Sequence, residues 1–140
     1  MKIVVIDGQG GKIGSLLIEK LKTAVPDAEI CAIGSNSIAT AAMLRAGANY
    51  GATGENPVVV NCRNADIIAG PIGIIVSCSL YGEITPRMAR AVGESPAQKL
   101  LLPVSKCNIT VAGTEKAQLA DHLNFIAEAA ARIAEGISNA

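Results

Sequence analysis

Residues 2–24, KIVVIDGQGGKIGSLLIEKLKTA, decide the fold that the sequence predicts. They begin with an uninterrupted run of β-branched residues, Ile3 to Ile6, which is typical of a strand buried on both faces of a parallel sheet. A cluster of glycines follows, and from Lys12 to Val25 apolar residues recur at helical spacing until Pro26 ends the segment. The stretch therefore predicts a strand, a glycine-rich turn and a helix in succession.

The remaining sequence continues this alternation. Further strands are predicted at residues 29–33, 66–69 and 99–104, with a short one at 109–112. Helices are predicted from a cap at Asn36 or Ser37 to a stop at Gly47, from the cap Thr85 and Pro86 to Gly93, and after the cap Thr114. A buried helix is also predicted for the apolar segment that follows Gly70-Pro71-Ile72-Gly73 and runs through Leu80. Residues 49–64 stay unassigned, because Pro57-Val-Val-Val-Asn fits a strand as well as the start of a helix.

Strands that alternate with helices predict an open α/β sheet. We expect a three-layer Rossmann-like fold, with a mostly parallel sheet of about five strands and helices on both faces. The 140 residues suit a single domain over residues 1–140, because domains most often have roughly 100–150 residues. There is no room for a separate substrate domain, which excludes a large two-domain dehydrogenase.

The composition argues against several kinds of partner. Twelve Lys and Arg balance twelve Asp and Glu, and aromatic residues make up 2% of the chain, so there is no basic field or stacking platform for nucleic acid. The longest charge-free stretch, residues 67–82, is shorter than the roughly 20 apolar residues of a membrane-spanning helix, and no signal peptide is recognisable. We expect a cytoplasmic protein that binds neither nucleic acid nor membranes.

The glycine-rich turn is the strongest functional signal. It lies between a predicted strand and a predicted helix, the context in which backbone N–H groups and a helix N-terminus hold a phosphate. The spacing is G-x-G-G-x-x-G, one residue longer than the dinucleotide fingerprint, and no Gly-Lys-Ser/Thr of a P-loop is present. A tight turn without a ligand remains the alternative. The predicted phosphate-binding residues are Gly8, Gln9, Gly10, Gly11, Lys12 and Ile13.

Other loops at the carboxyl ends of the strands complete the predicted site, because open α/β sheets bind ligands there. The second strand ends in Ser35 and Asn36, which could contact a ribose or only form a turn and a helix cap. The acid that binds the adenosine ribose in NAD proteins is missing, and so is an adjacent arginine for NADP. The sequence therefore leaves NAD and NADP open as cofactors. The opposite wall is predicted from Gly70, Pro71, Ile72 and Gly73.

Residues for catalysis are scarce. Cys107 beside Lys106 is a weak candidate nucleophile, since a neighbouring cation stabilises a thiolate. One histidine, His122, builds neither a catalytic triad nor a metal site, so no metal is expected. Asp7 could orient the glycine loop or contact a ligand, and Glu55 could bind a ligand or, as we favour, cap a helix.

The whole chain resembles a small family of uncharacterised bacterial proteins, mostly from Gram-positive anaerobes, described as a Rossmann-like domain of unknown function. The strings that carry the resemblance are IDGQGG at 6–11, IGSNSIATAAMLRAGA at 33–48, GATGEN at 51–56, DIIAGPIGI at 66–74, GEITPRMA at 82–89 and LLPVSKCN at 101–108. The resemblance implies no reaction or catalytic residue. More distantly, the first forty residues are similar to the start of NAD(P)-binding Rossmann domains.

Two hypotheses for function follow. The first is binding of a nucleotide, a dinucleotide such as NAD(P), or another phosphate-containing small molecule at the glycine-rich turn. The second is a non-catalytic, metabolite-sensing or partner-binding module that acts as a homo-oligomer. It is suggested by an apolar stripe in the last helix that could dock on the sheet or on another subunit: Leu119, Leu123, Ile126, Ala130, Ile133 and Ile137. Whether the protein is an enzyme is left open.

Overall fold

The computed structural model describes residues 1–104 and 108–138. At its centre is a five-stranded parallel sheet in the order β3-β2-β1-β4-β5. Its strands are β1 (Lys2–Asp7), β2 (Glu29–Gly34), β3 (Tyr50–Thr53), β4 (Ile67–Pro71) and β5 (Gln98–Leu102). This confirms the predicted open α/β sheet with about five strands.

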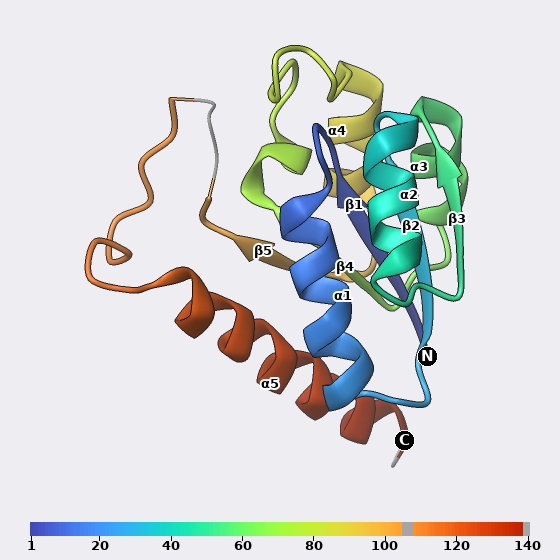
Figure 1. Ribbon diagram of the computed structural model, residues 1–140, viewed down its shortest axis with the longest axis vertical. Helices are drawn as coiled ribbons and strands as arrows, with labels where there is room; N and C mark the ends of the chain where they lie inside the picture. The colour runs from blue at the N-terminus through green and yellow to red at the C-terminus, as the bar shows by residue number, and fades with distance from the viewer. Residues whose placement is uncertain (105–107, 139–140) are drawn as a thin grey trace.

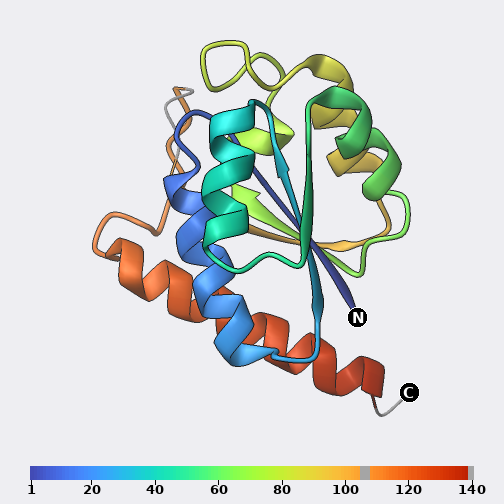
Figure 2. The ribbon, with the colours of Figure 1, turned by 45° about the vertical axis from the view of Figure 1, so that its right-hand side comes forward.

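Helices cover both faces of the sheet and make three layers, as Figure 1 and Figure 2 show. One face is covered by α1 (Lys12–Ala24), α2 (Ser37–Arg45) and α5 (Leu119–Ser138). The other is covered by α3 (Glu55–Asn61), the 3-10 helix η1 (Ile72–Ile75) and α4 (Pro86–Glu94). The strands must therefore be apolar on both sides.

Strand β1 shows how the sequence meets this demand. Ile3 and Val5 pack into the cluster under α1, α2 and α5, whereas Val4 and Ile6 pack into the cluster under α3 and α4. All four are completely buried. Alternating side chains on a strand point to opposite faces, so an uninterrupted β-branched run suits this central position.

The stretch left unassigned contains both a strand and a helix. Tyr50–Thr53 forms β3 at the edge of the sheet, and Glu55–Asn61 forms α3. Pro57 is the third residue of α3, where a missing N–H breaks no intrahelical hydrogen bond. The alternative of a strand at residues 57–61 is therefore wrong.

The buried helix predicted after Gly70-Pro71-Ile72-Gly73 and through Leu80 is also wrong. Gly70 and Pro71 still belong to β4, a single 3-10 turn occupies Ile72–Ile75, and turns follow up to Leu80. The backbone of Cys78 and Leu80 has φ of +65° and +54°. A left-handed backbone cannot continue a right-handed helix, so the apolar composition misled the prediction here.

Two predictions near the C-terminus fail as well. Residues 109–112 form no strand in the part of the chain that the structure describes, and Ile109 is exposed. The Thr114 hydroxyl donates to the Val111 carbonyl instead of capping a helix. Helix α5 begins at Leu119, where the Asp121 carboxylate accepts from the backbone N–H of Gln118. This is one half of a capping box.

The caps predicted for two other helices are confirmed. Asn36 accepts from the N–H of Ala39 at the start of α2, and Thr85 accepts from the N–H of Met88 at the start of α4. Helix α4 ends at Glu94, one residue after the predicted stop at Gly93.

Helix α5 docks on the chain's own sheet. Figure 1 shows it lying across α1 and beside β5. Leu123, Ile126 and Ala130 of the predicted stripe are buried in the core. Among the residues that the structure describes, no helix combines the length and apolarity needed to cross a membrane.

Candidate functional site

The candidate site lies where the chain changes direction across the sheet. Beyond β1 the chain adds β2 and β3 on one side, and it later returns to add β4 and β5 on the other. The loops after β1 and β4 therefore diverge and leave a crevice at their carboxyl ends, which is the ligand position in open α/β sheets.

Asp7 shapes the glycine loop, which we define as residues 8–11. Its carboxylate accepts from the N–H of Gly8 (2.8 Å) through Oδ1 and from the N–H of Gly14 (2.7 Å) through Oδ2. Burial raises the pKa of Asp7, and the two backbone hydrogen bonds act against this rise. Since both oxygens are engaged within the loop and the first turn of α1, Asp7 orients the loop.

Three backbone N–H groups of the loop and helix start are left without a partner. Gly10, Lys12 and Ile13 donate to no acceptor among the described residues, whereas Gly11 donates to the Gly8 carbonyl (3.0 Å). Gly11 caps α1 without a side-chain hydrogen bond. Free N–H groups at the positive end of a helix form an environment that suits an anion.

A cavity of about 410 Å³ opens beside these N–H groups. The glycine loop and the apolar side chains of Pro71, Leu80 and Val104 line it together. The cavity therefore combines a polar backbone surface with an apolar surface, which is typical of small-molecule sites.

The structure brings only part of the predicted site to this cavity. Gly8, Gln9, Gly10, Gly11, Lys12, Ile13 and Pro71 line it. The predicted residues that do not line it are Ser35, Asn36, Gly70, Ile72 and Gly73. Gly70 is buried in β4, where an added Cβ would lie 2.4 Å from the Ile6 carbonyl oxygen. Cys107 and its neighbour Lys106 lie outside the described residues.

Ser35 and Asn36 hold a carboxylate that the sequence analysis missed. Oε1 of Glu83 accepts from the Ser35 hydroxyl (2.6 Å), the Asn36 amide (2.7 Å) and the N–H of Gln9 (2.9 Å). The Asn36 amide also donates to the Gln9 carbonyl (3.0 Å). Glu83 thus joins the end of β2 to the glycine loop.

Hydrogen bonding controls the ionisation of Glu83. Partial burial alone would raise its pKa, but the bonds from Ser35, Gln9 and Asn36 hold the pKa below its ordinary value. Glu83 therefore carries a negative charge at neutral pH. In the sequence, Glu83 was marked only by its position within GEITPRMA, one of the strings that carry the family resemblance. No strand was predicted to end near it, so it was not assigned to the site.

Glu83 is carried by a strained loop, residues 76–85. Cys78, Leu80 and Tyr81 all have a left-handed backbone, with φ between 54° and 65°. The Cys78 N–H donates to the Ile84 carbonyl (2.7 Å), which closes the loop on itself. Strained backbone of this kind persists only where neighbouring contacts hold it, and it is concentrated at functional sites.

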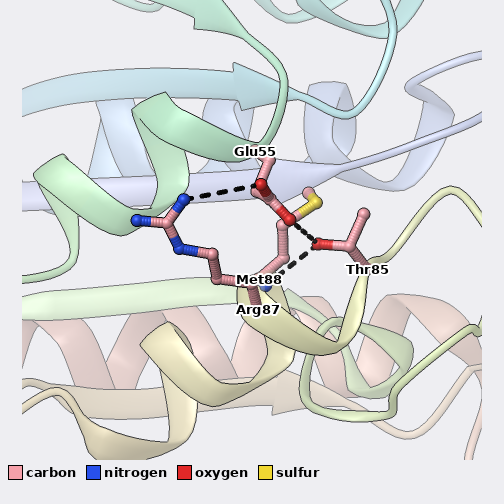
Figure 3. Close-up of polar contacts among 4 residues, drawn as sticks. All are labelled: Glu55, Thr85, Arg87 and Met88. Atoms are coloured by element: carbon pink, nitrogen blue, oxygen red, sulfur yellow. Dashed lines mark hydrogen bonds and ion pairs between the residues drawn. The ribbon is translucent and has the colours of Figure 1, made fainter.

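Figure 3 shows the contact that anchors the end of this loop. The Thr85 hydroxyl donates to Oε1 of Glu55 (2.6 Å) and accepts from the N–H of Met88 (3.1 Å). Arg87 lies 3.7 Å from Oε2 of Glu55. Glu55, the first residue of α3, therefore ties α3 to α4 and fixes the chain two residues after Glu83.

The bonds of Glu83 predict a pH-dependent stability. Glu83→Gln is expected to lower the free energy of unfolding by about 1 kcal/mol at pH 7, because the ionised acceptor is lost. A carboxylate whose pKa falls on folding stabilises the protein above its unfolded pKa of 4.5, and this contribution disappears as the pH falls through the folded value. The difference between wild type and variant should therefore be smaller at a pH well below 4.5 than at pH 7.

Urea unfolding at both pH values measures this difference. The contribution of Asp7 has the opposite sign, because a raised pKa means that its stabilisation is present at low pH and is lost as the pH rises. This contribution cancels only in part between the two proteins, since the charge of Glu83 adds to the effect of burial in raising the pKa of Asp7. A difference that is the same at both pH values would contradict the bonds described for Glu83.

A comparison with known protein families identifies the chain. One family model matches residues 2–135, almost its whole length. The chain belongs to the domain of unknown function DUF3842. A search of curated proteins gives no significant match to this DUF3842 chain.

A search of solved structures supports the fold. The DUF3842 chain is similar to a dodecameric FMN-dependent UbiX-like decarboxylase from Escherichia coli O157:H7, with a TM-score of 0.51. The two sequences are 14% identical, and the alignment covers 99% of this chain and 95% of the other. At this identity the similarity concerns the fold alone.

Proposed function

We propose that this DUF3842 protein binds a nucleotide or dinucleotide whose phosphate lies on the N–H groups of Gly10, Lys12 and Ile13. The observation that carries the proposal is the cavity at the carboxyl ends of β1 and β4, lined by these N–H groups, which donate to no acceptor among residues 1–104 and 108–138. The exposed Lys12 side chain adds a positive charge at the same place.

The apolar side chains that line the cavity indicate which further chemical group the ligand has. Pro71, Leu80 and Val104 offer an apolar surface on which a flat ring system can lie. The glycine loop that follows β1 makes NAD and NADP candidates, and FMN joins them because the similar decarboxylase is FMN-dependent. NAD, NADP and FMN are therefore the three probes with which to test the site.

A second candidate function is metabolite sensing by a homo-oligomer. Ile38 on α2 and Phe125 on α5 are large apolar side chains that are 68% and 65% exposed. The similar decarboxylase is a dodecamer. Contact between copies of the chain would cover such side chains. The bound nucleotide would then act by changing the assembly and would not take part in a reaction.

Gly10→Asp tests the proposed phosphate site. A Cβ at Gly10 meets nothing within 4 Å and the backbone is not left-handed, so the variant should fold. A carboxylate beside the bound phosphate is expected to weaken nucleotide binding by about tenfold or more. Isothermal titration calorimetry with NAD, NADP and FMN measures the affinities, and native mass spectrometry of the same samples gives the number of subunits.

Gly136→Asp is the matched control. It makes the same change at another open glycine in the last turns of α5, where the neighbouring Glu135 and Ile137 line a separate cavity with Met1 at the amino end of the sheet. This variant should bind like the wild type. Unchanged binding by a folded Gly10→Asp variant would contradict the site, as would a wild-type protein that binds none of the three nucleotides.

A further inference from the structure

The carboxyl end of β2 lacks the acid that nicotinamide-binding folds place there for the adenosine ribose. The strand ends at Gly34, and Ser35 and Asn36 follow. Glu83 from the loop 76–85 fills this position in space, because its Oε1 lies within hydrogen-bond distance of both Ser35 and Asn36. The carboxylate is thus supplied by a segment 48 residues further along the chain.

On this ground we propose that Glu83 is the ribose-recognition residue of the nucleotide site. It selects ligands with a free ribose diol, such as NAD, and rejects those with a phosphate on the 2′-oxygen, such as NADP. This inference rests on the proposed nucleotide-binding function and adds the class of ligand to it.

The two carboxylate oxygens of Glu83 have different surroundings. Oε1 accepts all three hydrogen bonds from Ser35, Asn36 and Gln9, whereas Oε2 accepts none from the described residues. The first oxygen therefore fixes the side chain, and the second is available to a hydroxyl donor. A carboxylate accepts hydrogen bonds and donates none, so it suits a diol.

Glu83, which would accept from the ribose hydroxyls, and the N–H groups that would donate to the phosphate lie at different parts of the glycine loop. Glu83 contacts the loop at Gln9, and an added Cβ on Gly8 would lie 3.0 Å from its Oε1. The N–H groups that donate to none of the described residues are those of Gly10, before the helix, and of Lys12 and Ile13 in the first turn of α1. Glu83 is not among the residues that line the cavity, but Gln9, which donates to it, is. The proposed ligand places its phosphate at the helix start and extends past Gln9 to bring its ribose to Glu83.

The charges at the end of β2 favour an unmodified ribose. No described cation forms an ion pair with Glu83, and the hydrogen-bond donors around its Oε1 are neutral. A second phosphate placed against this carboxylate would meet a like charge at short range. Ser35 and Asn36, predicted to contact the ribose, act as positioning residues for Glu83 instead.

Glu83→Gln tests the inference. An amide oxygen can keep the three bonds of Oε1, while the amide nitrogen replaces the free acceptor by a donor and removes the charge. The wild type is expected to bind NAD at least about tenfold more tightly than NADP, and the variant should lose this preference through weaker NAD and tighter NADP binding. Calorimetric titrations with both dinucleotides, and with FMN, measure the change.

Two further variants separate charge from hydrogen bonding. Glu83→Asp keeps the negative charge on a shorter side chain, so it should still reject NADP while binding NAD less tightly. Glu29→Gln is the matched control, because Glu29 lies at the amino end of β2, far from the carboxyl end where Glu83 sits, and also accepts from a hydroxyl, that of Tyr50 (2.6 Å). It should retain the wild-type preference.

The outcomes distinguish this inference from the proposed function. A wild type that binds a nucleotide but prefers NADP, or binds FMN alone, would overturn the role of Glu83 and leave the phosphate site standing. The same holds if a folded Glu83→Gln variant keeps the wild-type preference. A wild type that binds none of the three would overturn both.

Discussion

Gly11→Ala is expected to lower the free energy of unfolding by about 3 kcal/mol. Gly11 has a φ of +73°, in the left-handed region that disfavours residues with a Cβ. An added Cβ would also lie 2.8 Å from the Cα and from the carbonyl oxygen of Ala39. Both atoms belong to the backbone of α2, so no side-chain rotation relieves the overlap.

Gly10→Ala provides the comparison at the next residue. Its Cβ meets nothing within 4 Å, and we expect a change of less than about 0.5 kcal/mol. Urea unfolding followed by far-ultraviolet circular dichroism measures both variants. Equal unfolding midpoints for Gly10→Ala and Gly11→Ala would show that the loop does not approach α2 as described.

Asp7→Ala is the second change with a large expected effect. It removes the acceptor for the N–H groups of both Gly8 and Gly14, and these residues are buried. A buried N–H without a partner costs about 1–3 kcal/mol, so we expect a loss of about 2–4 kcal/mol of stability. The glycine loop should also lose its shape, and with it any affinity for a nucleotide.

Asp7→Asn is the graded control for this prediction. The amide has one acceptor oxygen where the carboxylate has two, so it can satisfy one N–H group and should lie between Asp7→Ala and the wild type in unfolding experiments. If Asp7→Ala is as stable as the wild type but loses nucleotide binding, Asp7 contacts the ligand and does not orient the loop.

The sequence was informative where local patterns determine structure. The run Ile3 to Ile6, the glycines after it and the apolar periodicity from Lys12 predicted β1, the glycine loop and α1. The caps Asn36 and Thr85 were also correct, because each bonds a backbone N–H three residues away. The glycine side of the candidate site follows from this local information.

Contacts between distant segments could not be predicted in the same way. Strand β3 is a short edge strand whose Tyr50 is half-exposed, so it lacks the apolar run of a buried strand. Glu83 meets the N–H of Gln9 across 74 positions of sequence. Nothing in the neighbourhood of Glu83 in the sequence indicates that its side chain completes the end of β2.

The hydrogen bonds of Glu83 also have a consequence for the assembly of the chain. The loop after β1 can take its turn from Asp7 and the glycines alone, but the carboxylate arrives only when β4 is in place and α4 is anchored through Thr85 and Glu55. The two halves of the sheet must therefore meet before the site is complete. A nascent chain that has emerged only as far as β3 contains the glycine loop but lacks the Glu83 carboxylate.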